Sequence, residues 1–174
     1  MKKFKIEVVG SGIIKPIKDG YMKKKLQQEL QQEMERIKKK IDGLSFDAPS
    51  TKKKYDKKTE NASETIKDEL KKIGYEKDQK FCKTEHEIDL VNYTKKIAVE
   101  IEMTKDTNLL TDLVKLSIAG KPKGKKRAIE HGLIIVQDKY KDHYEMVPSL
   151  KNYFELMGPI YWVRTLGWIS IKLV

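Results

Sequence analysis

The chain has 174 residues, of which 37 are Lys or Arg and 26 are Asp or Glu, and its formal net charge is +11. This length suits one domain with a hydrophobic core, and the positive charge favours an anionic partner, most simply nucleic acid. A lysine-rich surface that serves only solubility is the alternative. A single cysteine excludes an internal disulfide, and no apolar run approaches the ~20 residues of a membrane span. We therefore expect a cytoplasmic protein with no membrane association and no secretion signal.

The first 61 residues predict a strand, a long helix and a loop. Lys3–Val9 alternates apolar and polar residues as a strand does, and the glycines of Gly10-Ser-Gly12 are expected to end it. From Tyr21 to Asp42, apolar residues recur every three or four positions, which predicts a helix that Gly43 ends. The apolar stripe would pack on a core or, alternatively, pair with a second copy. We interpret the segment 44–61 as a loop, either a solvated linker or an arm that orders on DNA.

Residues 62–137 predict the order helix, strand, strand, helix, strand. The helices are expected over Ala62–Gly74 and 108–119, and the first two strands over Glu87–Tyr93 and Lys96–Met103. Gly132–Gln137 is a continuous apolar run, which is typical of a strand covered on both faces.

The last 37 residues, 138–174, predict a helix followed by strands. The helix is expected over Ser149–Met157 and the strands over Ile160–Val163 and Trp168–Val174, with Trp162 and Trp168 as core or interface anchors. We expect a single domain over 1–174, in which 62–137 forms the core that the flanking segments 1–61 and 138–174 extend.

Three carboxylates lie on the two adjacent predicted strands. Asp89 is on the first strand, and Glu100 and Glu102 share one face of the second because side chains alternate along a strand. Antiparallel pairing across a turn at 92–95 would bring Asp89 beside them. Three acids on one face repel one another unless a cation or a proton lies among them. A solvent-exposed acidic face is the alternative interpretation.

Oxygen ligands in this pattern suit a hard cation such as Mg²⁺. Asp89 and Glu100 would hold the ion, and the carbonyl of Ile101 between them would add a ligand. Glu102 would hold a second ion or act as the base that orients the attacking water. A bound ion generates a hydroxide-like nucleophile and offsets the charge that builds on a phosphodiester. The pattern therefore indicates metal-assisted hydrolysis as the candidate chemistry.

A basic loop follows the second helix of the predicted core. Residues 120–127, GKPKGKKR, carry five positive charges and are the strongest candidates for phosphate contacts, with a solubilising loop as the alternative. The candidate DNA-binding residues are Lys105, Lys121, Lys123, Lys125, Lys126 and Arg127.

The segment Glu87-Ile-Asp89-Leu-Val … Lys96-Ile-Ala-Val-Glu100-Ile-Glu102-Met-Thr-Lys-Asp resembles the active-site segment of PD-(D/E)xK nucleases. It is most similar to type II restriction endonucleases of the BamHI/BglII/BstYI-like group. The resemblance covers residues 85–116 and departs from the superfamily pattern twice. Glu87-Ile88 stands in place of Pro-Asp before Asp89, and Glu102 stands where most members have lysine, as an acid does in BamHI-like enzymes.

The resemblance implies a mixed α/β fold, with a central mixed sheet flanked by helices and a restriction-endonuclease-like core. It implies that Asp89 and Glu100 bind Mg²⁺ and that Glu102 is a base or a second-metal ligand. It further implies an acid or amide from an upstream helix, for which Glu69 is our candidate. The implied function is that of a type II restriction endonuclease, which cuts double-stranded DNA at a short palindrome as a homodimer.

Two other functions stay open at this point. A Holliday-junction resolvase, or another structure-selective nuclease, shares the superfamily core and the basic surface. Such enzymes usually keep the lysine that Glu102 replaces, so this hypothesis ranks below the restriction endonuclease. A DNA-binding protein without catalytic activity would carry the three acids only as a solvent face. Cleavage of plasmid DNA, of four-way junctions or of neither would separate the three functions.

Overall fold

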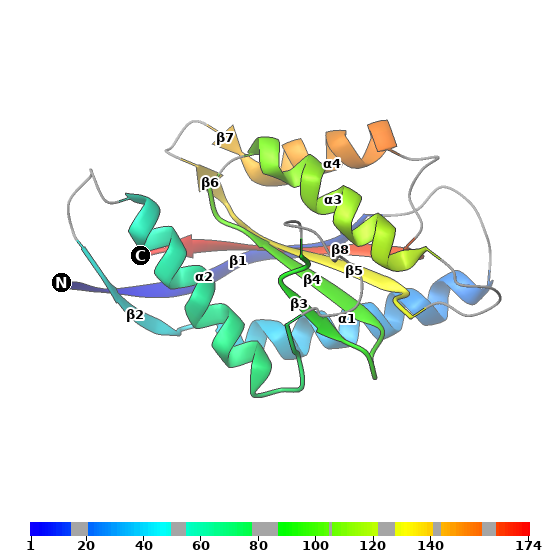
Figure 1. The fold of residues 1–174 in the computed structure, drawn as a ribbon, viewed down its shortest axis with the longest axis horizontal. Coiled ribbons are helices and arrows are strands. Elements are labelled where there is room, and N and C mark those ends of the chain that lie inside the picture. Colours follow the sequence, from blue (N-terminus) through cyan, green and yellow to red (C-terminus); the bar gives the residue numbers. More distant parts are fainter. Residues whose placement is uncertain are drawn as a thin grey trace.

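A sheet lies between helices on both of its sides in a computed structural model of the chain (Figure 1). The model describes residues 1–14, 21–49, 55–77, 87–104, 106–121, 128–140, 144–157 and 163–174. The sheet has six strands in the order β2-β1-β8-β5-β4-β3. Their bounds are Lys2–Ile14 for β1, Ser45–Ala48 for β2, Leu90–Asn92 for β3, Ile97–Glu102 for β4, His131–Gln137 for β5 and Thr165–Leu173 for β8. Two further strands, β6 (Lys139–Tyr140) and β7 (Tyr144–Glu145), form a separate short antiparallel pair.

The sheet is mixed. Strand β5 runs parallel to both of its neighbours, β4 and β8. At one edge β3 pairs antiparallel with β4, and at the other end β1 pairs antiparallel with β8 and β2. The predicted mixed sheet flanked by helices is confirmed, and the sheet takes strands from all three predicted segments of the chain.

Helices α1 (Tyr21–Ile41) and α2 (Tyr55–Lys71) cover one face of the sheet. The core-facing stripe of α1 is fully buried and consists of Leu30, Met34, Ile37 and Ile41. The apolar stripe of α1 therefore packs on the core of its own chain from Leu30 to Ile41. Gly43 follows α1 with a φ of 76°, a left-handed conformation that suits glycine at a helix end, as predicted.

Helices α3 (Asp106–Gly120) and α4 (Met146–Met157) pack together on the other face. Residues of β5 serve both cores: Leu133 and Ile135 pack on the side of α1 and α2, and Ile134 and Val136 on the side of α3 and α4. Every residue of β5 is buried, which confirms the prediction of a strand covered on both faces. Within the described ranges, no helix combines the length and the apolar character that crossing a membrane requires.

Two predictions about the N-terminal region are wrong. The glycines do not end the first strand, because β1 continues to Ile14 with a register shift between Val8 and Gly10. Trp168 of β8 lies against this part of β1, and a Cβ added at Gly12 would come within 3.0 Å of its ring. These glycines therefore make room for an aromatic ring and do not interrupt the strand.

The segment 44–61 is not a single loop either. Strand β2 lies within it because Phe46 and Ala48 alternate with exposed residues and are buried. Helix α2 begins at Tyr55, seven residues before the predicted start, so that the lysine-rich stretch runs into the helix. The sequence 50–54, between these two elements, lies outside the described residues.

Replacing Gly12 with alanine should lower the free energy of unfolding by about 1–3 kcal/mol, because the new Cβ and the Trp168 ring cannot both keep their places. Urea denaturation followed by circular dichroism measures the change. Val9→Ala, at a neighbouring β1 residue that is 40% exposed, should cost clearly less. Equal losses for the two variants would contradict the role assigned to Gly12.

Candidate active site

The pairing of β3 with β4 brings the predicted acids together. Asp89, the residue before β3, accepts a hydrogen bond through Oδ2 from the amide of Ile101 in β4, at 2.9 Å. Ile101 packs in the core under α1 and α2, and Ala98 packs in the core under α3 and α4. Glu100 and Glu102 therefore share the face of Ala98, since side chains alternate along a strand. The predicted neighbourhood of Asp89 and the shared face of the two glutamates are both confirmed.

Glu100 is almost completely buried, with 1% of its side chain exposed. Its Oε2 accepts a hydrogen bond from Lys115 Nζ at 3.0 Å, and its Oε1 has no hydrogen-bond partner. Burial raises the pKa of Glu100 well above its usual value; Asp112 and Asp89 raise it further, and Lys115 opposes them. A buried carboxylate with one open oxygen is suited to receive a proton or a cation.

Two residues of α3, Lys115 and Asp112, lie next to Glu100, although the sequence pattern did not indicate them. Lys115 Nζ lies 3.0 Å from Oδ1 of Asp112, which is buried one helical turn earlier. Burial raises the pKa of Asp112 to about 6; Lys115 opposes this shift, and Glu102 and Asp89 add to it. An Asp and a Lys three positions apart are visible in the sequence, but such pairs are common on helix surfaces. Only the placement of α3 over Glu100 identifies this pair as part of the site.

Helix α2 contributes a second lysine from the other side. Lys67 Nζ lies 2.8 Å from Oδ1 of Asp89 and 3.3 Å from Oε1 of Glu64. Burial lowers the pKa of Lys67, but Asp89 and Glu64 raise it, and the net shift is upward. Lys67, Glu64 and Glu102 line one hollow of about 270 Å³ between α2 and the end of β4. This hollow gives solvent a route to the acidic group.

Glu102 is buried at the end of β4. Its Oε1 accepts hydrogen bonds from the backbone amide of Thr104 at 2.6 Å and from the Thr104 hydroxyl at 2.7 Å. These bonds fix the carboxylate next to the hollow. Of the predicted acids, the structure thus brings together Asp89, Glu100 and Glu102.

The remaining predicted site residues are elsewhere or outside the described ranges. Glu69 pairs with Lys72 at 2.6 Å along α2 and does not line the hollow, whereas Glu64 does. Lys121 is exposed directly after α3. The other predicted DNA-binding residues, Lys105, Lys123, Lys125, Lys126 and Arg127, lie outside the described residues.

The donor set fits a divalent cation. Asp89, Glu100, Glu102 and Asp112 all offer oxygen atoms, which hard cations such as Mg²⁺ prefer. One of these atoms, Oε1 of Glu100, is buried without a hydrogen-bond partner. Within the described ranges, no three Asp, Glu, His or Cys side chains are already arranged as a metal site. A bound ion would therefore require movements of the carboxylates and of the lysines that contact them.

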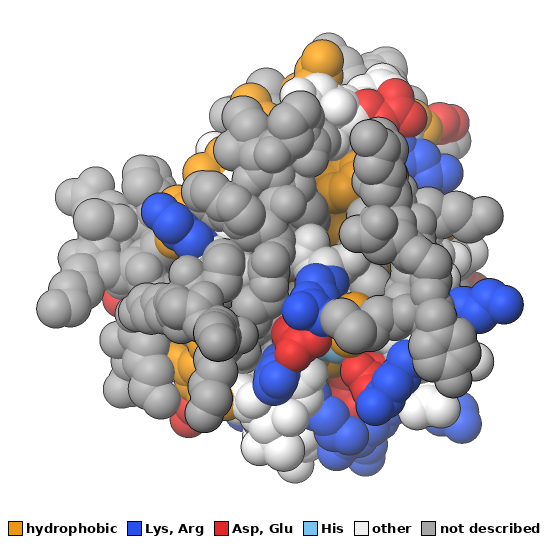
Figure 2. All heavy atoms as spheres, turned by 90° about the vertical axis from the view of Figure 1, so that its right-hand side faces the viewer, with side chains coloured by type: hydrophobic (Ala, Val, Ile, Leu, Met, Phe, Trp, Pro, Cys, Tyr) orange, Lys and Arg blue, Asp and Glu red, His pale blue; other side chains and the backbone are white. Residues whose placement is uncertain are grey.

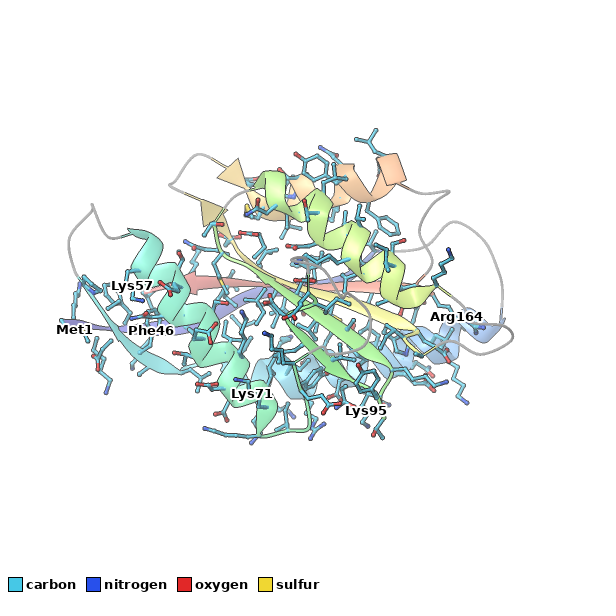
Figure 3. The ribbon with its side chains drawn as sticks, in the orientation of Figure 1. Met1, Phe46, Lys57, Lys71, Lys95 and Arg164 are labelled. Atoms are coloured by element: carbon cyan, nitrogen blue, oxygen red, sulfur yellow. The ribbon has the colours of Figure 1, made fainter. Side chains whose placement is uncertain are left out.

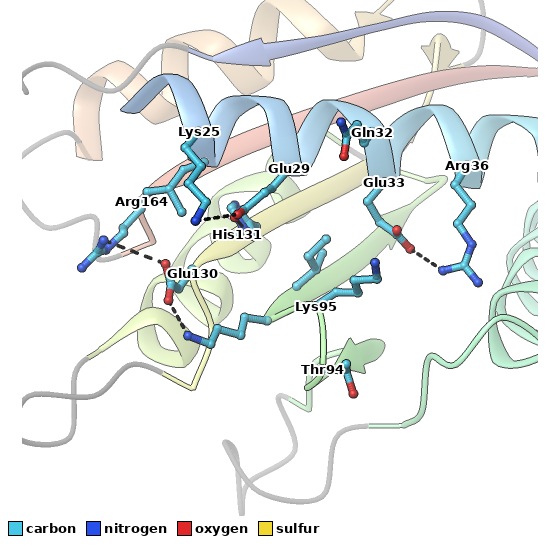
Figure 4. A pocket seen from close by; sticks show the side chains of 13 residues that line it. Lys25, Glu29, Gln32, Glu33, Arg36, Thr94, Lys95, Glu130, His131 and Arg164 are labelled. Carbon is cyan, nitrogen blue, oxygen red and sulfur yellow. Dashed lines mark hydrogen bonds and ion pairs between the residues drawn. The ribbon is translucent and has the colours of Figure 1, made fainter. Parts of the chain in front are cut away.

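A larger cavity, of about 710 Å³, lies at the opposite ends of β4 and β5 (Figure 4). Its acids are already paired with bases: Glu130 with Lys96 at 2.6 Å, and Glu33 with Arg36 at 3.1 Å. Figure 3 places Arg164, another lining residue, at this end of the molecule. Figure 2, which views the same end, shows basic and acidic side chains intermixed. The acids of β4, and not this cavity, therefore remain the candidate site.

A mixed sheet with an Asp beside β3 and two Glu on β4 is the arrangement that the resemblance to PD-(D/E)xK nucleases implies. The family model described as "Restriction endonuclease BglII/BglIII" matches residues 22–155, and the chain belongs to this family. The solved structure of BglII complexed with a DNA 16-mer has the same fold, with a TM-score of 0.56 and 15% identity, covering 95% of this chain and 77% of that chain. No curated protein sequence matches the chain.

These findings confirm the predicted family, fold and enzyme class. The protein is a type II restriction endonuclease, and thus a metal-dependent endodeoxyribonuclease. Neither alternative from the sequence, a junction resolvase or a non-catalytic DNA-binding protein, gains support from the comparisons. Enzymes of this family generally use a divalent metal ion.

The raised pKa of Asp112 predicts how stability depends on pH. Because the folded protein raises this pKa from 3.8 to about 6, the stabilising contribution is complete below pH 3.8 and is lost as the pH rises through 6. With EDTA present, Asp112→Asn should therefore gain stability relative to the wild type between pH 4 and pH 7, on the order of 2 kcal/mol. Urea denaturation at several pH values measures this gain.

Asp68→Asn is the matched control, because Asp68 also has a lysine three residues later but is exposed, and its pKa is lowered. The control should not gain stability over this pH range. A stability difference between Asp112→Asn and the wild type that stays constant with pH would contradict the burial argument.

Proposed function

We propose that Asp89, Glu100 and Glu102 form a Mg²⁺-dependent catalytic site that hydrolyses phosphodiester bonds of double-stranded DNA at a short palindromic sequence. The observation that carries this proposal is the buried, unpartnered Oε1 of Glu100, on the same face as Glu102 and beside Asp89. A net charge of +11 supplies long-range attraction for the DNA.

Asp89 and Glu100 would hold the ion, with the carbonyl of Ile101 as a further ligand. When bound, a divalent ion activates water and offsets the negative charge of the transition state. The protein holds one ligand in place, because the Ile101 amide donates a hydrogen bond to Oδ2 of Asp89. Glu102, fixed by Thr104, is the proposed base that orients the attacking water.

The upstream acid that the resemblance implies is better supplied by Glu64 than by Glu69. Glu64 lines the hollow beside Glu102 and contacts Lys67, which in turn contacts Asp89. Glu69 is engaged with Lys72 outside this hollow. We therefore propose Glu64 for this role.

The BglII structure with the same fold is a complex with a DNA 16-mer, which supports DNA as the substrate. We propose that the basic residues near α3 contact its phosphates, because they follow the catalytic strand β4 in the chain and flank α3. These residues are Lys105, Lys121, Lys123, Lys125, Lys126 and Arg127.

An apolar stripe on α3 supports a homodimer. Leu110, Val114 and Ile118 follow one another at intervals of four residues, so they lie along one side of the helix, and they are 42%, 42% and 43% exposed. Leu156 on the neighbouring α4 is 78% exposed. A second copy packed two-fold symmetrically against α3 would bury this stripe, and a two-fold dimer matches a palindromic site.

Glu100→Ala should reduce cleavage of plasmid DNA in Mg²⁺ by at least about a hundredfold, because it removes the proposed metal ligand. Gel electrophoresis of plasmid and of synthetic four-way junctions, with Mg²⁺ or with EDTA, measures this. Discrete plasmid fragments that need Mg²⁺ support the restriction enzyme. Cutting of junctions alone would favour a resolvase, and cutting unchanged by Glu100→Ala would refute the proposed site.

Val114→Glu should weaken dimerisation at least about tenfold, because it places a charge in the centre of the α3 stripe. Size-exclusion chromatography with light scattering measures the mass as a function of concentration. Val9→Glu is the control: Val9 has similar exposure but lies on β1, and its substitution should leave the mass unchanged. A dimer that persists in Val114→Glu would exclude this stripe as the interface.

A further inference from the structure

The acids of the candidate site are in contact with lysine side chains from two helices. Lys115 Nζ of α3 is 3.0 Å from both Oε2 of Glu100 and Oδ1 of Asp112. Lys67 Nζ of α2 is 2.8 Å from Oδ1 of Asp89. Lys115 is the more enclosed of the two, with 16% of its side chain exposed against 21% for Lys67. The buried carboxylates therefore already have an internal positive charge between them.

The position of Lys115 conflicts with that of a metal ion at Glu100. Its ammonium group bridges two carboxylates, as a bound cation would, and it engages one of the two oxygens of Glu100. The other oxygen of Glu100 is buried and open. A divalent ion bound there would lie close to the ammonium group, and repulsion between like charges is strong at a site with this little solvent. Contact of the Lys115 ammonium group with Glu100 and binding of a divalent ion to Glu100 therefore weaken each other.

Asp112 can remain paired with the ammonium group of Lys115 when that group leaves Glu100. It lies three residues before Lys115 on the same helix, so this contact does not depend on Glu100. Lys115 can thus leave Glu100 and remain paired inside the protein. Without Asp112, a displaced ammonium group would have to stay buried without a counter-charge, which is costly.

We propose that Lys115 is a resident counter-cation, which a divalent metal ion must displace from Glu100, and that Asp112 retains the displaced ammonium group. The inference rests on the proposed metal-binding role of Glu100 and adds a competition that limits metal affinity. Loading of the site with metal is then coupled to a movement of one lysine of α3.

Binding of Mn²⁺ alone, without DNA, tests the competition. Electron paramagnetic resonance of free Mn²⁺ gives the affinity of the wild type and of Lys115→Met. The variant should bind Mn²⁺ at least about tenfold more tightly, because both the competitor and its repulsion are removed. Lys115→Arg keeps the charge and should bind Mn²⁺ about as the wild type does.

Lys71→Met is the matched control, because Lys71 forms an exposed pair with Asp68 at the same spacing on α2. It removes one positive charge from an exposed pair that does not include Glu100, and it should leave Mn²⁺ affinity unchanged within about twofold. If Lys115→Met does not fold, Lys115→Gln keeps a polar group beside Asp112 and should also bind more tightly than the wild type. As a second measurement, Mn²⁺ should raise the melting temperature of Lys115→Met or Lys115→Gln more than that of the wild type.

Weaker, unchanged or undetectable Mn²⁺ binding by both neutral variants would overturn the inference. A lysine that only orients Glu100 would weaken metal binding when it is removed, which is the opposite sign. Failure of the proposed function looks different: the wild type would then not cleave plasmid DNA in Mg²⁺, or Glu100→Ala would leave cleavage intact. Mg²⁺-dependent cleavage that needs Glu100, without tighter Mn²⁺ binding in the variants, would refute the role of Lys115 alone.

Discussion

The site depends on one constraint: both faces of β4 are buried, although one of them carries two glutamates. On one face Val99 and Ile101 pack in the core under α1 and α2, and on the other Glu100 and Glu102 are buried, with Glu100 in contact with Lys115 of α3. Burying acids is costly unless positive charges or hydrogen-bond donors accompany them. Lys115 of α3 supplies a positive charge to Glu100, and the amide and hydroxyl of Thr104 supply hydrogen bonds to Glu102. Helix α3 thus does more than cover the sheet, because its lysine allows Glu100 to be buried.

The sequence correctly predicted those features of the structure that arise within a single short stretch of the chain. The period of α1, the continuous apolar run of β5 and the alternation of β4 are each visible in a short stretch of chain, and the structure confirms all three. The resemblance around Asp89, Glu100 and Glu102 rests on one such stretch, and the family match confirms the nuclease that it implied.

What the sequence did not predict depends on which elements meet in space. Gly12 was expected to end a strand, because nothing nearby in the chain shows that Trp168 lies against it. Lys115 and Asp112 have the spacing of an ordinary surface pair, and only the packing of α3 on β4 gives them a buried partner. Glu69 was selected from the pattern of α2, but the hollow faces a different side of that helix, which carries Glu64 and Lys67.

The order of the strands has a consequence for biosynthesis. Strand β8 is the last of the described strands to leave the ribosome, yet it lies in the middle of the sheet, between β1 and β5. Its end pairs with the start of the chain, through hydrogen bonds of 2.7 and 2.9 Å between Lys5 and Val174 (Figure 1). A nascent chain that lacks residues 165–173 cannot join β1 to β5, so its sheet stays open. The six-stranded sheet that carries the acids of β4 is therefore complete only after residues 165–173 have left the ribosome.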